Sequence, residues 1–338
     1  MKKTLIVSIV LVVAVLSLAL TACSNGDMPK VDTLAGLENW MDSIENDTPL
    51  RRIAIPGSHD SGTVGMMSLA ETQGASIKEQ LLYGVRYFDI RVNGKGGKIF
   101  HGPVNGVPFA PIADDLRDFI KAHPSETLIL DFQHFKNGGE KFVYDTIKSN
   151  GLLDMAVTKS DKNMSDIDFI NSLTLSDVRG KVLVFFGNSI ANDYDTVFLR
   201  NNDDCTRDGA SLDSLYLGDE HKKGSEHFIT SALPKYMAHI KDKNSGLLVL
   251  QGQLTAPNLM TSPLSLEVNH SDNMNKYTRA IKDNADDLKA VNIIMRDFVE
   301  QDNEKVLSIL SLNIAKGCVK ESALDAYTTL CSYIEEVV

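Results

Sequence analysis

The sequence places histidines, aspartates and one arginine inside or directly after short apolar runs, where buried strands would end. The residues concerned are His59, Asp60, Asp89, Arg91, His101, Asp131, Asp219 and Asp297. Histidine titrates near neutral pH, so two imidazoles can take a proton at one end of a reaction and deliver one at the other. Arginine keeps its proton and presents a planar fork of donors that matches phosphate oxygens. This set predicts phosphoryl transfer with acid–base catalysis by histidine.

In such a reaction one histidine deprotonates the attacking hydroxyl, and the arginine neutralises the charge that grows on the phosphate. If the hydroxyl belongs to the substrate itself, the step is intramolecular and the product is a cyclic phosphodiester. Asp60 and Asp297 are the candidates for fixing the histidine tautomers. Clusters of His and Asp also bind divalent ions, but Arg91 would repel one, and no HExxH or EF-hand pattern occurs. We therefore expect neither a metal nor a cofactor.

The elements that must position these residues are eight short apolar runs separated by helix-like segments. Runs of this length suit strands buried on both faces, as in a parallel sheet. Helices are predicted over 111–126, 274–290 and, as a closing amphipathic helix, 323–338. Eight alternating strands indicate a (β/α) barrel of the TIM type, with a doubly wound open sheet as the alternative. The predicted strands are 51–55, 85–92, 98–102, 127–132, 181–186, 214–218, 246–252 and 291–298.

The barrel interpretation gives the polar residues a shared position. In such barrels the catalytic groups lie at the carboxyl ends of the strands. We expect these side chains to meet at one rim. The chain has 338 residues, of which 43% are hydrophobic and 23% charged, and it contains no long linker. Residues 37–338 are therefore predicted to form one α/β barrel domain that ends in a helix.

The first residues have the layout of an export signal. Two lysines precede an apolar segment over 5–20, and small residues lead to Cys23. The ending "LTAC" resembles a bacterial lipobox, so we expect a lipoprotein signal peptide over 1–22, lipidation of Cys23 and a tether over 23–36. An ordinary signal peptide or a transmembrane anchor is the alternative. Each of these predicts an exported protein, and lipidation predicts one anchored to the membrane of the cell envelope.

Charge and cysteine content exclude several classes of protein. The formal net charge of -11 leaves no electrostatic footprint for nucleic acid and no attraction to anionic membrane. Beyond Cys23, the chain has Cys205, Cys318 and Cys331, an odd number without CxxC spacing. Neither a zinc site nor a disulfide scaffold is indicated, although one bridge stays possible. Trp40 could pack under the barrel or insert at a membrane interface.

Several motifs together resemble the bacterial phosphatidylinositol-specific phospholipase C family. They are "LENWMDSIENDTPLRRIAIPGSHDSGT", "GVRYFDIRV", "FHGP" and "HPSETLIL". The similarity runs from about Leu37 to about Phe298 and is densest over the first hundred of those residues. It implies an X-type catalytic domain with a distorted (β/α) barrel fold. It also implies metal-independent cleavage of phosphatidylinositol to diacylglycerol and inositol 1,2-cyclic phosphate.

Carried over to this chain, the resemblance implies that His59 is the general base that takes the proton of the inositol 2-hydroxyl. His101 falls on the general acid that protonates the diacylglycerol oxygen, and Arg91 falls on the arginine that contacts the phosphate. In the calcium-dependent relatives a carboxylate ligand stands at the position of Arg91. The pattern here is the metal-independent one.

Three aspartates match the supporting carboxylates of the family. Asp60 matches the aspartate paired with the acid histidine, and Asp297 matches the one that orients the base. Asp89 matches a carboxylate beside the arginine. The resemblance therefore extends to the whole catalytic set.

The positions that would contact the headgroup depart from the family. Gln133 stands where a lysine would contact inositol, Gly187 near a second arginine, and His221 near the tyrosine that stacks on the ring. Asp219 plausibly matches a further residue that contacts the substrate. For both Asp219 and Asp131, a structural ion pair is an equal alternative to a substrate contact. The substrate is therefore more open than the reaction. Besides phosphatidylinositol, we consider glycosylphosphatidylinositol anchors, another phosphodiester, or a catalytically silent lipoprotein that binds inositol or a glycan.

Overall fold

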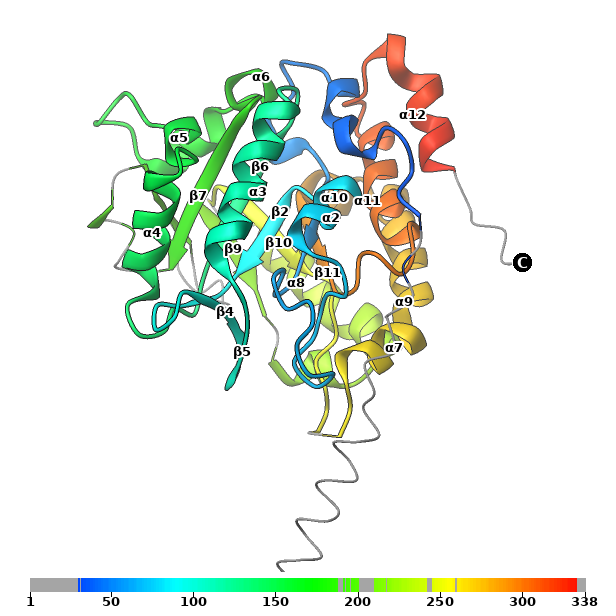
Figure 1. The fold of residues 1–338 in the computed structure, drawn as a ribbon. Helices are drawn as coiled ribbons and strands as arrows, with labels where there is room; N and C mark the ends of the chain where they lie inside the picture. Colours follow the sequence, from blue (N-terminus) through cyan, green and yellow to red (C-terminus); the bar gives the residue numbers. More distant parts are fainter. Residues whose placement is uncertain are drawn as a thin grey trace, which may run out of the picture.

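A computed structural model describes residues 30, 32–187, 191, 193–194, 196–200, 210–216, 218–241, 245–258 and 260–332. Eight parallel strands close into a barrel in which β1 pairs with both β2 and β11 (Figure 1). The prediction of a TIM-type barrel is confirmed, and the open-sheet alternative is wrong. In order around the barrel the strands are β1 (Ile55–Ser58), β11 (Ile293–Arg296), β10 (Leu247–Gln251), β9 (Leu212–Leu215), β8 (Phe198–Arg200), β7 (Lys181–Gly187), β6 (Thr127–Phe132) and β2 (Tyr87–Ile90).

The barrel strands are apolar because both of their faces are buried. All six residues of β6 are buried, and its register with β7 pairs Leu128 with Val182 and Ile129 with Leu183. Successive side chains of a strand point to opposite faces. Ile129 and Leu183 accordingly belong to the core inside the barrel, whereas Leu128 and Val182 pack outward against the helices. This arrangement explains why the strands read as near-continuous apolar runs.

Helices cover the outside of the barrel, and several begin at a capping side chain. At α2, Ser76 and Glu79 form a capping box. The hydroxyl of Ser76 accepts from the backbone N–H of Glu79, and the carboxylate of Glu79 accepts from the backbone N–H of Ser76. The helices are α2 (Ile77–Leu82), α3 (Phe109–Ala122), α4 (Gly139–Ser149), α5 (Asp166–Ser172), α6 (Leu175–Val178), α7 (Ser225–His227), α8 (Leu233–Lys241), α9 (Pro263–Ala280), α10 (Ala285–Ala290), α11 (Glu304–Ala315) and α12 (Leu324–Cys331). None of the described helices is both long and apolar enough to cross a membrane.

The predicted helices are present with different limits. The helix predicted over 111–126 is α3, and the closing helix is α12, whose prediction beyond residue 332 lies outside the described residues. The segment 274–290 is not one helix, because α9 ends at Ala280 and α10 begins after Asn284. The side chain of Asn284 accepts bonds from the N–H groups of Asp286 and Asp287, which starts a new helix.

Two predicted barrel strands are displaced along the chain, since β1 begins only at Ile55 and β9 ends at Leu215. One further predicted strand does not belong to the barrel. Residues 98–102 form β4 (Lys98–His101), which pairs antiparallel with β3 (Val92–Asn93) and β5 (Val104–Pro108) in a separate three-stranded sheet. Gly102 has a φ of 53° in the turn between β4 and β5, so the chain reverses there and cannot cross to a parallel neighbour. The eighth place in the barrel belongs to β8, whose three residues carried no recognisable strand pattern.

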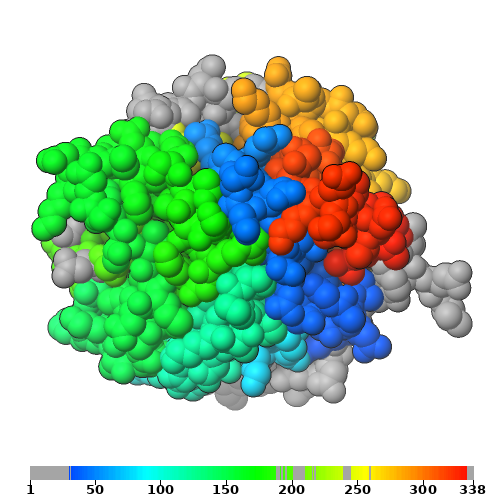
Figure 2. Space-filling view, turned by 90° about the horizontal axis from the view of Figure 1, so that it is seen from above, coloured from blue at the N-terminus to red at the C-terminus, as the bar shows by residue number. Residues whose placement is uncertain are grey.

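The segment before β1 covers the amino end of the barrel, together with α12 (Figure 2). It contains two short 3₁₀ helices, η1 (Leu37–Ser43) and η2 (Leu50–Arg52). Trp40 of η1 is 1% exposed and donates from Nε1 to the carbonyl of Gly84, 2.9 Å away, so it packs in the core and does not insert at a membrane. Cys318 and Cys331 are buried free thiols. Cys205, Cys23 and the predicted signal peptide lie outside the described residues.

Candidate active site

Strand register brings three distant segments together at the carboxyl end of the barrel. Ser58, the last residue of β1, pairs with Arg296 of β11 on one side and with Phe88 of β2 on the other. The residues that follow these positions are therefore neighbours. His59 and Asp60 come after β1, and Asp297 comes after β11. Asp89 is the last but one residue of β2, and Arg91 follows the strand. The site predicted at this rim is assembled by the barrel itself.

His59 is fixed by Asp297 across this register. Nδ1 of His59 lies 2.8 Å from Oδ1 of Asp297, whose side chain is 2% exposed. A carboxylate only accepts, so Nδ1 carries a proton and Nε2 points away from Asp297. The buried amide of Gln73 donates to the carbonyls of His59 and Arg296, both at 2.9 Å, and thereby ties the two segments together. Nothing in the sequence around Gln73 signalled this role.

Asp60 contacts both imidazoles and the guanidinium of the site. Its Oδ2 lies 3.3 Å from Nε2 of His59 and 3.5 Å from Nε2 of His101, while its Oδ1 lies 2.6 Å from Nε of Arg91. The side chain is almost completely buried, and the backbone adopts a φ of 44°. This left-handed conformation is uncommon outside glycine and tends to mark functional turns. Here it turns the carboxylate back between the two imidazoles.

Arg91 is held between two carboxylates. Besides Asp60, its NH2 group lies 3.3 Å from Oδ2 of Asp89, and that same oxygen accepts from the backbone N–H of Asp60 at 3.3 Å. NH2 also lies 3.5 Å from Nε2 of His59. The side chain of Arg91 keeps 17% of its surface exposed, although its partners are buried. Two buried carboxylates thus fix the direction of a partly exposed cation.

His101 reaches the site from outside the barrel. It is the last residue of β4, and the hairpin of β4 and β5 lies at the carboxyl end of the strands (Figure 1). Its Nδ1 donates to the carbonyl of Ala70 at 2.8 Å, which leaves Nε2 directed at Asp60. The sequence correctly predicted that His101 joins this cluster, even though it assigned 98–102 to the wrong sheet.

The charges set the protonation of the site. Burial alone would lower the pKa of His59, but the carboxylates of Asp297 and Asp60 outweigh burial and raise it to about 9. Burial would raise the pKa of Asp89, yet Arg91 and His59 lower it to about 2. In the free protein at neutral pH, His59 is therefore an imidazolium among carboxylates.

One group in the described residues has the geometry of a metal site, namely His59, Asp60 and Asp89. Arg91 contacts both of these carboxylates, so a cation placed among them would meet a fixed positive charge. Carboxylates that already pair with a guanidinium make a poor ligand set for a divalent ion. The arrangement favours an anionic ligand in front of Arg91.

The predicted headgroup residues do not gather in one place. Gln133 lies at the site, where it is 2% exposed and hydrogen-bonds to Asp89. His221 is 1% exposed, donates from Nδ1 to the carbonyl of Gln253 at 2.9 Å and stacks on Tyr216. Burial lowers its pKa to about 4. Asp219 is 83% exposed and pairs with Lys222 at 2.9 Å, which matches the structural alternative.

Asp131 belongs to a buried polar cluster inside the barrel, and the sequence did not indicate its partners Arg200 and Tyr87. Asp131 lies 2.7 Å from Nε of Arg200 and accepts from the hydroxyl of Tyr87 at 2.7 Å. Arg200 of β8 pairs in register with Gly187 of β7. Asp131 therefore forms a structural ion pair. Burial raises its pKa to about 6, because Asp89 is close and Arg200 compensates only in part.

Comparison with known proteins finds similarity over the first half of the barrel. Residues 46–186 match the family model of the phosphatidylinositol-specific phospholipase C X domain. A 1-phosphatidylinositol phosphodiesterase of Listeria monocytogenes is 30% identical over 160 residues, which cover 45% of this chain and 49% of that protein. The human protein named PI-PLC X domain-containing protein 2 is 31% identical over 152 residues, covering 34% of this chain and 50% of that protein. The chain thus spans about half the length of these relatives.

Solved structures show the same fold over most of the chain. The phosphatidylinositol-specific phospholipase C from Listeria monocytogenes superposes with a TM-score of 0.61 at 19% identity, covering 82% of this chain and 98% of that one. A phosphatidylinositol-specific phospholipase C from Staphylococcus aureus gives a TM-score of 0.61 at 22% identity, covering 82% and 99%. The likeness in fold extends past residue 186, since 82% of the chain is covered.

Proposed function

We propose that this chain, which carries a phosphatidylinositol-specific phospholipase C X domain, cleaves phosphatidylinositol into diacylglycerol and inositol 1,2-cyclic phosphate. The observation that carries the proposal is the carboxylate of Asp60, whose Oδ2 faces Nε2 of both histidines while its Oδ1 pairs with Arg91. A phosphodiester bound in front of Arg91 would have one imidazole to activate its nucleophile and a second to protonate its leaving group.

In the proposed first half of the reaction, His59 removes the proton of the inositol 2-hydroxyl through Nε2. Asp297 holds Nδ1–H and stabilises the imidazolium that forms. The raised pKa of His59 means that it must lose its proton before it can act as the base. The hydroxyl then attacks the neighbouring phosphorus, and the intramolecular step benefits from proximity.

In the second half, His101 gives a proton from Nε2 to the diacylglycerol oxygen as the phosphorus–oxygen bond breaks. The bond from Nδ1 of His101 to Ala70 keeps this nitrogen directed at the site. Asp60 faces Nε2 of both histidines, and its carboxylate helps to raise the pKa of His59. Arg91 stabilises the negative charge on the phosphate oxygens and takes the place that a metal ion has in other phosphodiesterases.

A direct test compares the full-length chain with His59→Gln on phosphatidylinositol in detergent micelles. The wild type is expected to release water-soluble inositol phosphate, and the variant is expected to lose at least 100-fold in rate with an unchanged circular dichroism spectrum. Full turnover by a folded His59→Gln variant would refute the assignment. It would favour the alternative of a protein that only binds inositol or a glycan.

The headgroup positions support a second candidate substrate, a glycosylphosphatidylinositol anchor or another phosphodiester. Gln133 is committed to Asp89, and Asp219 projects into solvent and pairs with Lys222. Neither offers the cationic contact that a lysine would give to the inositol ring. Comparing release of an anchored protein with turnover of phosphatidylinositol separates the two substrates.

The amino-terminal sequence supports export and lipidation of Cys23, which would place the enzyme at a membrane surface in the cell envelope. Labelling cells with a fatty acid should mark the wild-type chain and not Cys23→Ser. An unlabelled wild-type chain in the culture medium would point to an ordinary signal peptide instead.

A further inference from the structure

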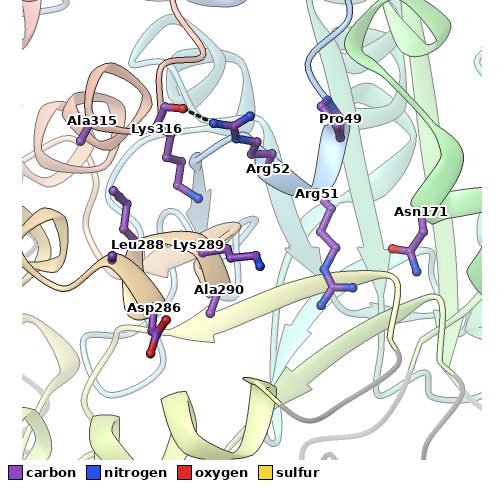
Figure 3. Close-up of a pocket in the computed structure, with 11 residues that line it drawn as sticks. Pro49, Arg51, Arg52, Asn171, Asp286, Leu288, Lys289, Ala290, Ala315 and Lys316 are labelled. Atoms are coloured by element: carbon purple, nitrogen blue, oxygen red, sulfur yellow. Dashed lines mark hydrogen bonds between the residues drawn. The ribbon is translucent and has the colours of Figure 1, made fainter.

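A second pocket opens at the other end of the barrel. Its volume is about 1120 Å³, somewhat above the range of about 300–1,000 Å³ for small-molecule sites. Figure 3 shows Arg52 bonded to Lys316 on one side, Arg51 beside Asn171 on the other, and Lys289 between them. The remaining lining residues are Pro49, Ala285, Asp286, Leu288, Ala290 and Ala315.

The pocket is distant from the catalytic cluster although it uses the same strands. Arg51 and Arg52 belong to η2, just before β1, and α10 leads into β11. His59 and Asp297 follow the opposite ends of these two strands. At a rise of about 3.3 Å per residue, the two sites are separated by about 20 Å. The amino end of such barrels usually serves stability, so charged groups there need their own explanation.

Four cations line this pocket, and only one carboxylate does. Among the described residues, none of Arg51, Arg52, Lys289 and Lys316 forms an ion pair, and Asp286 is exposed. The whole chain carries a formal net charge of -11, so a local excess of positive charge runs against its composition. Like charges held close together repel one another, and a bound anion relieves that repulsion.

Backbone carbonyls fix the direction of the cations. Arg51 donates from NH1 to the carbonyl of Ser245 at 2.8 Å, and Arg52 donates from NH2 to the carbonyl of Lys316 at 2.5 Å. The other donors of each guanidinium stay available to a ligand. Lys316 is 5% exposed and donates to the carbonyl of Val291. Donors that are already ordered lose less conformational entropy when a ligand binds.

Two further groups support a ligand here. Oδ1 of Asn171 is buried without a hydrogen-bond partner, while its Nδ2 donates to the carbonyl of Ser245 at 3.2 Å. Asn171 lines the same pocket, and an acceptor without a partner suits a hydroxyl group of a ligand. Burial, with a smaller effect of Arg52, lowers the pKa of Lys316 to about 8. An anion next to this lysine would favour its charged form.

We propose that this pocket is a second binding site and that it takes a soluble organic phosphate bearing at least two negative charges and a hydroxyl group. Arginine forks match phosphate oxygens, and the concave shape suits a small molecule more than a polymer. That the ligand is soluble and not a lipid headgroup rests on the proposed function, because the catalytic end would face the membrane and this end would face away.

Calorimetric titration of the full-length chain with sodium pyrophosphate tests the proposal. The wild type is expected to bind, and the double variant Arg51→Gln, Arg52→Gln is expected to bind at least tenfold more weakly. Lys289 is exposed on α10, and Lys289→Gln is expected to weaken binding about threefold. This single variant replaces the double variant as the test if the double variant does not fold. The matched control is Lys78→Gln with Lys276→Gln, two exposed lysines outside the pocket.

Three results would overturn the proposal. The first is no binding of pyrophosphate to the wild type at millimolar concentration. The second is equal affinity in the wild type and in folded variants of the pocket, which would place the anion at Arg91 or elsewhere. The third combines two observations: the wild type does not bind pyrophosphate, and it binds phosphatidic acid vesicles that the double variant does not bind. This result would assign the pocket to a lipid surface.

Discussion

Two arginines flank strand β2, and they differ in what surrounds them. Arg86, at the amino end, is completely buried, pairs with Glu126 at 2.8 Å and donates to four backbone carbonyls, namely those of Leu81, Val85, Leu37 and Glu38. Arg91, at the carboxyl end, contacts two aspartates and keeps 17% of its surface exposed. The donors of Arg86 are used within the buried core, whereas those of Arg91 hold two carboxylates at a partly exposed rim. The same residue type thus stabilises one end of the strand and prepares the other end for a ligand.

The largest expected effect tests the structural arginine. Arg86→Met leaves the carboxylate of Glu126 buried and unpaired, which should lower the free energy of unfolding by about 3–5 kcal/mol. Urea denaturation monitored by circular dichroism measures this loss. The rate per folded molecule should stay close to that of the wild type. A variant of normal stability but no activity would reverse the roles assigned to the two arginines.

The counterpart at the other end is Arg91→Lys. A lysine keeps the charge but lacks the planar fork, so the rate on phosphatidylinositol should fall by about 10²–10³-fold. The melting temperature should change little because the positive charge beside Asp60 and Asp89 is retained. An unchanged rate would show that only the charge of Arg91 matters.

Asp297→Asn tests the base at the same rim. Removing this carboxylate should lower the pKa of His59 from its value of about 9, because Asp297 is the largest of the charges that raise it. The rate of the wild type should rise with pH up to about 9 as His59 loses its proton. The variant should be about tenfold slower, with the rising limb of kcat/KM at lower pH. Parallel profiles would exclude His59 as the titrating base.

The same pKa shift predicts how stability depends on pH. The pKa of His59 is raised above the unfolded value of about 6.5, so its contribution is complete below that pH. The contribution is lost as the pH rises toward about 9. Asp297→Asn should therefore show a smaller loss of stability than the wild type between these values in urea titrations. An equally steep loss in both proteins would contradict the prediction.

The smallest expected effect concerns Gln73, which ties the histidine segment to the segment of Asp297. Gln73→Leu removes the donor to the carbonyls of His59 and Arg296 and should lower kcat by about threefold to tenfold, with KM unchanged. Gln80→Leu is the matched control, since this buried amide donates to Ser61 and Ala75. A greater loss of kcat in the control would deny Gln73 a positioning role.

The sequence predicted the barrel because its strands are apolar on both faces, and it predicted the rim because polar residues follow those strands. It failed where pairing is decided by tertiary contacts. The apolar pattern of β4 resembles that of a barrel strand. The turn at Gly102 nevertheless pairs β4 with β5 in the hairpin that carries His101. Strand β8 is too short for any periodicity to register.

Local sequence also gave no indication of the connections between distant residues. Gln73 reaches His59 and Arg296 across the fold, and Arg200 pairs with Asp131 inside the barrel. The departure at His221 was visible in the sequence, but its stacking on Tyr216 depends on packing between separate elements. Residue types and spacing specify the chemistry of the rim, and strand register brings its residues together.

The most direct test of the central claim is phosphorus NMR of the water-soluble products formed by the full-length chain. The substrate is phosphatidylinositol in micelles, and the buffer contains excess chelator. We expect a cyclic inositol phosphodiester without added metal, because two histidines and Arg91 supply the acid, the base and the positive charge. Product that forms only after calcium is added would contradict the role of Arg91, and a first product that is not cyclic would contradict attack by the inositol 2-hydroxyl.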